Sequence, residues 1–389
     1  MINSTPAPTR RLTHLFLALL LIDGLLAAGS GVVPTLGTIH PFVAWPTAFL
    51  AAVLYCGLAL TRRLVARILL PAIFFSIWVT VCGAFPFRIE DPTAGTVWVG
   101  IAQTLLASVL LAFTLDRPMT HRIPGFAWRR FAIFAALAIL LIPAALGIAS
   151  LNLFAVGINE STSGYARLRP DGIYLEERRF SRDNKEVRLV GMIHVARNGF
   201  FDSVAESFAG SGPAIVLTEG VTDEGNLLEH GFSYAGLAEL LGAIPQESAR
   251  LTPAGRYPAG FEDDYETERS GVRYRRADVD IGSFSPETIA ILNSLGAFLA
   301  DPSNPASLSE LRGPDSPLRR PDAQDKLLGD IVTNRNAHLL EQIDEALDSA
   351  NLVIVPWGAM HLPEIELHLL ANGFTEKART PRAAFLFWQ

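Results

Sequence analysis

Residues 187–200 read V-R-L-V-G-M-I-H-V-A-R-N-G-F, an apolar strand pattern that runs into the corner Gly191-x-x-His194. A glycine at such a corner lets the backbone turn, or approach a neighbouring strand, without a Cβ clash. His194 follows the apolar run directly, and α/β proteins place ligand-binding groups just past the ends of buried strands. The stretch therefore predicts a strand end that presents an imidazole.

Two further apolar runs in the second half of the chain end in a similar way. One enters the corner Gly358-x-x-His361, and the other ends on Glu219. Neutral imidazole and carboxylate are typical ligands of a divalent metal, and three protein ligands with one open position describe a hydrolytic site. A metal held by His194, Glu219 and His361 would convert bound water into a nucleophile at neutral pH. The alternative is that each residue is a hydrogen-bonded structural residue at its strand end.

Arg335 lies on the apolar stripe of the predicted helix 322–349, four residues after Ile331 and four before Leu339. A guanidinium on the core face needs a partner, because a buried unpaired charge costs several kcal/mol. We therefore expect a carboxylate, Glu219, or a substrate oxyanion close to Arg335. The alternative is a side chain whose charged head extends past the stripe into water.

Acidic residues elsewhere in the second half have simpler interpretations. Asp278 and Asp280 alternate on a predicted strand, 277–281, and are expected to face solvent rather than to support a site. The interval 245–276 is charged and rich in Gly, Pro and Tyr, and is expected to be a long loop. Such loops either cover sites or are merely mobile.

Composition divides the chain into two units. Half of its 389 residues are apolar and the mean hydropathy is +0.29, which is too hydrophobic for an ordinary soluble protein. The apolar residues concentrate before about residue 152 and the charges after it. Both cysteines, Cys56 and Cys82, fall in the apolar half, so the second half has no thiol for a disulfide or a nucleophile. The net charge of −7 without a basic cluster argues against nucleic acid as a partner.

Five apolar runs are long enough to cross a lipid bilayer, at roughly 20 residues each. They are residues 12–30, 42–61, 64–85, 97–115 and 130–152. The fold class that follows is an α-helical membrane bundle of about five spans, residues 12–152, after a cytoplasmic tail, residues 1–11. An α/β soluble domain, residues 153–389, follows the bundle.

Arginines predict the orientation, because positively charged short loops stay in the cytoplasm. They cluster before the first run, between the second and third, and between the fourth and fifth, whereas residues 31–41 carry no cation and residues 86–96 carry one, Arg88. We therefore expect an integral membrane protein with a cytoplasmic N-terminus and an extracytoplasmic C-terminal domain. Interpreting the first run as a cleaved signal peptide changes the number of spans but leaves that domain outside.

Asp23 is the one clear ionisable residue well within a span, with His14 near the interface. An intramembrane acid is a functional hypothesis by default, but one acid without a partner makes a poor proton relay. The simpler interpretation is an anchor in which Asp23 faces other helices. A third Gly-x-x-His, Gly37 to His40, follows no soluble strand and is interpreted as a chance match.

The second half alternates between strand and helix patterns. The expected strands are residues 172–178, 187–193, 214–218, 351–357 and 383–388. The expected helices are residues 200–209, 234–242, 286–299, 322–349 and 362–372.

On four of these segments the second half resembles the TraB/TIKI superfamily, which includes erythromycin-esterase-like and ChaN-like relatives. The matching pieces are Gly191-x-x-His194, Thr218-Glu219-Gly220, Asn334-Arg335-Asn336 and Gly358-x-x-His361. They occur in the family's order and span residues 190–370. The chain departs from the family in its five-span N-terminal unit, and in Leu-Thr-Glu-Gly where many relatives carry a Val-Glu-Leu type of segment.

TIKI members are membrane-tethered metalloproteases that act outside the cytoplasm, so the resemblance implies peptide-bond hydrolysis with a divalent metal such as Mn, Co, Zn or Fe. By that resemblance His194, Glu219 and His361 are metal ligands or catalytic groups, and Arg335 acts with Glu219. Gly191, Gly358 and Asn336 have supporting roles.

Sequence and resemblance together predict a membrane-anchored, metal-dependent hydrolase that cleaves a peptide or a small amide or ester outside the cytoplasm. The first alternative is a non-enzymatic regulatory or sensor protein that uses the same imidazoles for a ligand, haem or iron. The second is a transport or signalling protein whose outer domain is a sensor.

Overall fold

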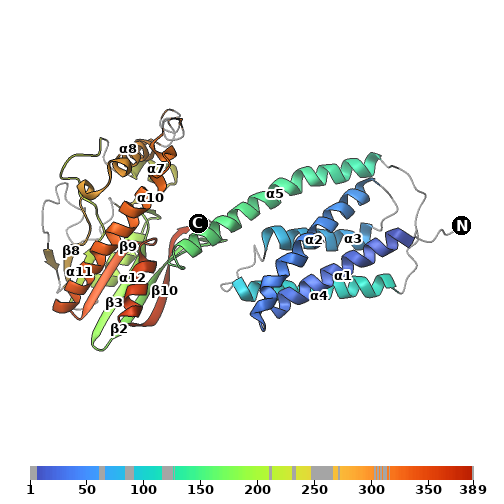
Figure 1. Cartoon of the computed structure of the whole chain (residues 1–389), viewed down its shortest axis with the longest axis horizontal. Helices are drawn as coiled ribbons and strands as arrows, with labels where there is room; N and C mark the ends of the chain where they lie inside the picture. The colour runs from blue at the N-terminus through green and yellow to red at the C-terminus, as the bar shows by residue number, and fades with distance from the viewer. Residues whose placement is uncertain are drawn as a thin grey trace. The chain divides into compact units, whose positions relative to one another are not determined.

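The chain forms two compact units, Met1–Phe154 and Ala155–Gln389. The first is helical, and the second combines a sheet with helices in this computed structural model (Figure 1). The structure describes residues 7–60, 66–83, 92–115, 126, 128–209, 213–229, 234–246, 266–269, 272–301, 304, 306, 309, 313–314 and 316–387.

The described part of the first unit consists of apolar helices. They are α1 (Ala7–Gly29), α2 (Pro34–Leu60), α3 (Ala66–Cys82), α4 (Pro92–Leu115) and α5 (Trp128–Ser161), whose last turns belong to the second unit. Four of these, α1, α2, α4 and α5, contain segments that are long and apolar enough to cross a membrane. The helix α3 has 17 residues, fewer than the roughly 20 that a span needs, although its core is equally apolar.

Four candidate spans support association with a membrane, while a fifth span stays a prediction. Most of the arginines that predict the orientation lie in loops outside the described residues, at positions 62–63 and 117–122. The orientation of the unit therefore also stays a prediction.

An eight-stranded mixed sheet organises the second unit. Its order is β1-β2-β3-β9-β5-β8-β7, with β10 paired to β2. The strands are β1 (Ala166–Arg169), β2 (Gly172–Arg182), β3 (Lys185–Met192), β5 (Ala214–Thr218), β7 (Glu266–Arg269), β8 (Val272–Arg276), β9 (Leu352–Gly358) and β10 (Thr375–Leu386). The short strands β4 (Val195–Ala196) and β6 (Ile244–Pro245) pair separately. The four neighbours β3, β9, β5 and β8 run parallel, so their carboxyl ends lie at the same edge.

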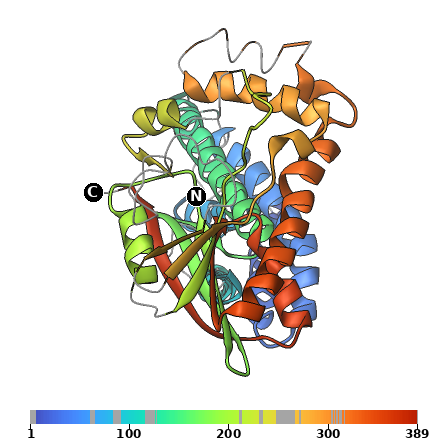
Figure 2. The same cartoon turned by 90° about the vertical axis from the view of Figure 1, so that its left-hand side faces the viewer.

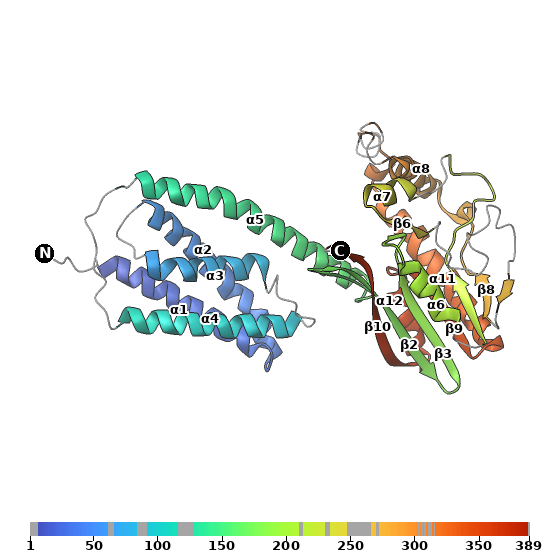
Figure 3. The same cartoon turned by 180° about the vertical axis from the view of Figure 1, so that it is seen from behind.

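Helices cover both faces of this sheet. The helices α11 and α12 lie on the face turned to the viewer in Figure 1, and α6 lies on the opposite face in Figure 3. Figure 2 shows the sheet between these two layers. The helical elements are α6 (Phe200–Ala209), α7 (Ala235–Leu240), η2 (Ile281–Ser283), α8 (Pro286–Ala300), η3 (Pro317–Arg319), α10 (Ala323–Leu328), the π-helix η4 (Gly329–Asn334), α11 (Arg335–Ser349) and α12 (Leu362–Ala371).

Burial on both faces explains why the central strands are almost continuously apolar. All five residues of β5 are buried, as are the first six of β9, which is the pattern of parallel strands between two helical layers. The shared core includes Phe180 on β2, Val355 and Trp357 on β9, and Ile343 on α11. This core fixes the ends of β5 and β9, and hence the residues that follow them.

Most of the predicted elements are confirmed, with ends that differ by one or two residues for the central strands. Four predictions were wrong in detail, among them the strand predicted at 277–281, because β8 ends at Arg276. The interval 245–276 is not all loop, because it contains β7 and β8. The last strand covers Thr375–Leu386 rather than 383–388. The helix predicted at 322–349 is divided by the π-helix Gly329–Asn334.

Candidate functional site

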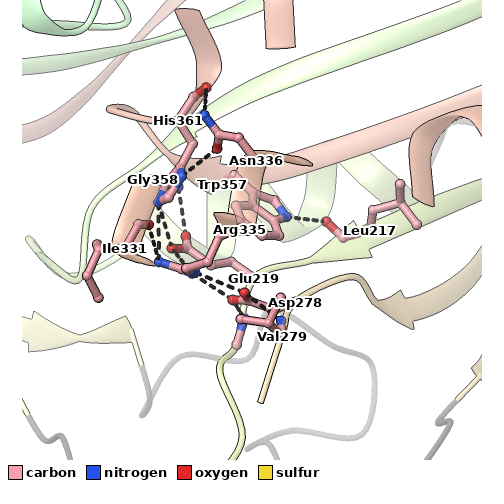
Figure 4. A network of polar contacts seen from close by, with 11 residues as sticks. Leu217, Glu219, Asp278, Val279, Ile331, Arg335, Asn336, Trp357, Gly358 and His361 are labelled. Carbon is pink, nitrogen blue, oxygen red and sulfur yellow. Dashed lines mark hydrogen bonds and ion pairs between the residues drawn. The ribbon is translucent and has the colours of Figure 1, made fainter. Parts of the chain in front are cut away.

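Four side chains follow the carboxyl ends of the four parallel strands. His194 comes after β3, His361 after β9, Glu219 after β5 and Asp278 after β8. The carboxyl ends of parallel strands are where open α/β sheets bind ligands. Figure 4 shows three of the four, Glu219, Asp278 and His361, gathered around Arg335 of α11.

Both oxygens of the Glu219 carboxylate take a hydrogen bond. Arg335 Nη2 donates to Oε1 over 2.8 Å, and the Gly358 backbone N–H donates to Oε2 over 2.7 Å. Burial raises the pKa of Glu219 and is the largest single influence on it, but the charge of Arg335 acts in the opposite direction. With the neighbouring imidazoles and the Gly358 N–H, the pKa of Glu219 is lowered to about 2. Glu219 is therefore a buried carboxylate that is ionised at neutral pH.

Arg335 is bound by two carboxylates rather than one. Its Nε donates to Asp278 Oδ1 over 2.9 Å and its Nη2 to Asp278 Oδ2 over 2.6 Å, besides the bond to Glu219. The guanidinium carbon also lies 5.2 Å from the centre of the Trp357 ring, within cation–π range. The contact expected between Arg335 and Glu219 is present. The alternative, in which the charged head of Arg335 extends into water, is wrong, because the residue is only 6% exposed.

Asp278 was expected to face solvent, and that expectation was wrong. Its side chain is fully buried. Besides Arg335, it accepts hydrogen bonds from the backbone N–H groups of Gly220 and Val279, both over 2.9 Å. The strand β8 ends at Arg276, so Asp278 lies two residues past its end rather than on one of its faces.

A signal for Asp278 was present in the sequence. Val272 and Tyr274 alternate inward on β8, but the arginines between and after them hide this pattern. Asp280, two residues on, does stand in a partly exposed loop, where its carboxylate accepts hydrogen bonds from Thr222 Oγ1 and from the backbone N–H groups of Glu224 and Gly282.

The imidazole of His361 is held in one tautomer. The Asn336 amide donates from Nδ2 to Glu364 Oε2 over 2.6 Å, so its Oδ1 must be the atom that faces His361 Nδ1, 2.7 Å away. An amide oxygen only accepts, so Nδ1 carries the proton and Nε2 carries a lone pair. That lone pair faces Arg335 Nη1 at 3.3 Å and Glu219 Oε1 at 3.7 Å.

Burial also keeps this imidazole neutral. His361 is 4% exposed. Burial lowers the pKa of His361, and the charge of Arg335 lowers it further, against the opposing effect of Glu219. A neutral imidazole with a fixed tautomer and a lone pair on Nε2 is suited to accept a proton or to bind a metal.

His194 belongs to the same electrostatic environment but contacts another residue. Its ring stacks on Tyr234, with the ring centres 4.5 Å apart and the planes 10° from parallel. Its backbone oxygen accepts a hydrogen bond from the Gln246 N–H over 2.7 Å. His194 also contributes to lowering the pKa values of Glu219 and His361. The sequence therefore placed His194 near the site, while the hydrogen-bonded cluster itself consists of Glu219, Asp278, Arg335, Asn336 and His361.

The two corner glycines differ in what they require. A Cβ on Gly191 would lie 3.1 Å from the backbone oxygen of Glu176 and 3.2 Å from that of Tyr165. On Gly358 the nearest atoms, from His361 and Glu219, would lie at 3.4 Å or more, which is ordinary contact. The lack of a side chain at Gly191 thus allows neighbouring backbone oxygens to lie close to it. Gly358 contributes to the site through its backbone N–H, which donates to Glu219.

The donor types of the site fit a divalent metal. His361 has a lone pair on Nε2, fixed by a hydrogen bond to Nδ1 as in many metal-binding histidines. The formal charges of Glu219, Asp278 and Arg335 sum to −1, which favours a cation. In the described part of the chain, however, no group of three or more His, Cys, Asp or Glu residues is arranged to hold an ion. The metal therefore stays a prediction.

The cluster lies just below the surface of the domain. Glu219, Arg335 and His361 are each less than a tenth exposed, but Met360 is 55% exposed and Gly220 is also exposed. Two residues next to the buried cluster in sequence, Gly220 and Met360, are thus at the surface.

Comparison of the chain with protein-family models, with curated proteins and with solved structures finds no match.

Proposed function

We propose that this protein is a membrane-anchored hydrolase whose C-terminal domain cleaves a peptide, or a small amide or ester, outside the cytoplasm. The observation that carries the proposal is the neutral, tautomer-fixed imidazole of His361, which faces the ionised carboxylate of Glu219 at the carboxyl ends of parallel strands. The four apolar helices and the distribution of arginines support the membrane anchor and the outward orientation.

His361 is the proposed general base. Its Nε2 lone pair removes a proton from a water molecule as that water attacks the substrate carbonyl. The imidazolium that forms is stabilised by the Glu219 carboxylate, whose Oε1 is 3.7 Å from Nε2. The same proton then passes from Nε2 to the leaving group. General-base catalysis of this kind contributes about 10²–10⁴-fold to a rate.

Arg335 has two parts with different roles. Its Nε and Nη2 donate short hydrogen bonds to Asp278 and Glu219, and these bonds hold both carboxylates in place. Its Nη1 has only long contacts, 3.3 Å to His361 Nε2 and 3.5 Å to the Ile331 backbone oxygen. Nη1 is therefore the nitrogen of the fixed guanidinium that can donate to a substrate carbonyl oxygen brought beside it, and it would stabilise the negative charge that develops there.

A divalent metal, Mn, Co, Zn or Fe, is the second form of the proposal, because the Nε2 lone pair of His361 can accept a proton or bind a metal but not both. His194, Glu219 and His361 would hold it, and it would supply an acidified water and polarise the carbonyl. Asn336 would then orient the His361 ligand through Nδ1, as it does for the free imidazole.

The test uses the purified full-length chain in detergent or lipid nanodiscs. Its metal content is measured by mass spectrometry, and hydrolysis is assayed on a panel of peptides, amides and esters with and without a chelator. We expect His361→Gln to lower hydrolysis by about 10²–10⁴-fold. His338→Gln is the matched control, because His338 is a partly exposed histidine on α11, three residues from Arg335, and it should hydrolyse at the wild-type rate.

Equal hydrolysis by wild type and His361→Gln would overturn the catalytic role. Loss of hydrolysis on chelation, restored by one metal, would establish the metal, whereas chelator-resistant hydrolysis that needs His361 would leave the imidazole as the base and remove the metal. Haem absorbance that disappears in His194→Ala or His361→Ala, with no hydrolysis, would select the non-enzymatic alternative of a ligand-binding sensor.

A further inference from the structure

Asp23 in the first unit faces other helices, as expected, but it is not without a partner. Gln103 of α4 donates from Nε2 to Asp23 Oδ2 over 2.7 Å, and also to the backbone oxygen of Leu20 over 3.1 Å. His40 of α2 places Nε2 3.1 Å from Asp23 Oδ1. The Gly37-to-His40 segment was interpreted as a chance match, yet its histidine contacts the carboxylate of Asp23. Three helices bring an acid, an imidazole and an amide together inside an apolar unit.

Asp23 and His40 lie at the same depth of this unit. Asp23 stands six residues before the end of α1 at Gly29, and His40 stands six residues after the start of α2 at Pro34. At 1.5 Å per residue, each is about 9 Å from the turn that joins the two helices. The Asp23 side chain is 2% exposed and that of His40 is 20% exposed. The carboxylate is thus enclosed, while the imidazole beside it is accessible.

Two glycines bring Gln103 over Asp23. A Cβ on Gly24 of α1 would lie 2.8 Å from the Thr104 backbone nitrogen and 3.0 Å from the Gly100 oxygen. A Cβ on Gly100 of α4 would lie 2.4 Å from the Ala28 nitrogen. Backbones this close require small residues at a membrane-helix crossing. Asp23 precedes Gly24, and Gln103 lies about one turn after Gly100. The close crossing of α1 and α4 at the two glycines therefore brings Asp23 and Gln103 into contact.

The charge on Asp23 depends on its neighbours, and the described ones supply no permanent cation. The helix α4 has no titratable residue, and α1 and α2 contribute His14, Tyr55 and Cys56 at nine or more residues from Asp23 or His40, about 14 Å or more along the helix. The arginines of α1, Arg10 and Arg11, stand at its opposite end, and Arg67 and Cys82 stand at the two ends of α3. His40 is therefore the titratable group that faces Asp23.

Hydrogen bonding in this cluster is incomplete. Asp23 Oδ1, His40 Nε2 and Gln103 Oε1 are buried and have no hydrogen-bond partner among the described residues. The 3.1 Å approach of His40 to Asp23 is close enough for an ion pair but is not directed as a hydrogen bond. Buried polar atoms without partners are rare, and they mark sites with a role or a missing group.

We propose that Asp23 and His40 form a proton-binding site in the helical unit, with Gln103 as the residue that holds the carboxylate in position. A proton is the ligand that the geometry fits. It can bind to Oδ1 or to Nε2, which lie 3.1 Å apart and have no other partner among the described residues. A metal ion would meet only one carboxylate, whose other oxygen already accepts the Gln103 N–H. With one proton the pair is neutral, which avoids the cost of an unpaired charge in an apolar unit.

The experiment is infrared difference spectroscopy on the full-length chain in lipid nanodiscs, titrated with pH. We expect a carboxylic acid C=O band that is lost in Asp23→Asn and retained in Asp202→Asn, a control at an exposed acid of α6. In His40→Gln the pH profile of this band should shift by about one unit or more, because two coupled groups titrate together. In Gln103→Leu the band should shift in frequency, since its hydrogen bond to the carboxylate is gone.

The proposal would be overturned if the wild-type spectrum contained no carboxylic acid band that is lost in Asp23→Asn. It would also be overturned if the pH profile of that band were the same in His40→Gln as in wild type. If Asp23→Asn does not purify as a folded chain, the His40→Gln profile still decides, because it follows the same band with Asp23 in place. Addition of Na⁺, K⁺ or Zn²⁺ at constant pH should leave the band unchanged, and displacement of the band by one of these ions would assign the site to that cation instead.

Discussion

Each of the two units buries a carboxylate beside an imidazole and an N–H donor. The difference between them is that one carboxylate also binds an arginine and the other, among the described residues, does not. Glu219 accepts from Gly358 N–H over 2.7 Å and lies 3.7 Å from His361, and Asp23 accepts from Gln103 over 2.7 Å and lies 3.1 Å from His40. Glu219 also binds the guanidinium of Arg335. Asp23 has no such cation among its described neighbours.

That difference separates two roles for similar groups. Arginine stays protonated at any pH a protein meets, so a carboxylate that it binds keeps its charge. Histidine changes charge near neutral pH, so a carboxylate that depends on it shares in that change. Glu219 is thus a fixed charge that positions other groups, while the proton-binding role proposed for Asp23 needs a carboxylate without such a cation. Each prediction below removes or weakens one part of the fixed arrangement.

Removal of the cation should have the largest effect. Arg335→Ala leaves Glu219 and Asp278 buried without their shared partner, and breaking a buried ion pair costs about 3–5 kcal/mol. We expect a loss of this size in the free energy of opening of β5 and α11, measured by hydrogen exchange with mass spectrometry on the full-length chain. Arg319→Ala, at an exposed arginine, is the control and should exchange as wild type does. Unchanged exchange in Arg335→Ala would mean that the cluster contributes no stability.

Acid should act on Glu219 in a defined pH window. The pKa of Glu219 is lowered from 4.5 to about 2 in the folded chain, so its contribution to stability is complete above 4.5 and is lost as the pH falls towards 2. The full contribution is on the order of 3 kcal/mol. Urea unfolding of wild type and Glu219→Gln at several pH values should show two curves that differ most above pH 4.5 and converge towards pH 2. Parallel curves would contradict a carboxylate that stays ionised.

Sequence patterns predicted those parts of this site that depend on local periodicity. Glu219, His194 and His361 follow short apolar runs with the pattern of buried strands, and Arg335 interrupts an apolar helical stripe, so each was identified from its own segment. The partner of Arg335 was inferred because a buried guanidinium requires one.

The missed residues depend on contacts between distant segments. Asp278 joins the cluster because β8 pairs in parallel with β5, and the arginines of β8 conceal that it is a strand. Asp23 and His40 meet because two helices turn back at Gly29–Pro34 and a third crosses at Gly100. Neither pairing is encoded in the periodicity of one segment, so the sequence alone favoured a solvent-facing Asp278 and an isolated Asp23.

The tautomer of His361 is the next part to test. Asn336→Ala removes the acceptor of Nδ1–H and leaves a buried donor without a partner, at a cost of about 1–3 kcal/mol. Hydrolysis should also fall, because the ring loses the contact that directs Nε2 towards Glu219. Urea unfolding and the hydrolysis assay measure the two effects. The control is Asn351→Ala at an exposed asparagine, and equal results for the two variants would remove Asn336 from the site.

The smallest expected effects distinguish the two corner glycines. Gly191→Ala places a Cβ 3.1 Å from a backbone oxygen that can move by only a few tenths of an ångström, so we expect a loss of about 1 kcal/mol, the low end of overpacking. Gly358→Ala meets only side-chain atoms at ordinary contact distance and keeps the N–H that Glu219 accepts, so its free energy of unfolding should stay within about 0.5 kcal/mol of wild type. Urea unfolding of both variants decides this. A large loss in Gly358→Ala would show that the lack of a side chain, and not only the N–H, holds the carboxylate, and the fixed charge of Glu219 would then depend on tight packing as well as on Arg335.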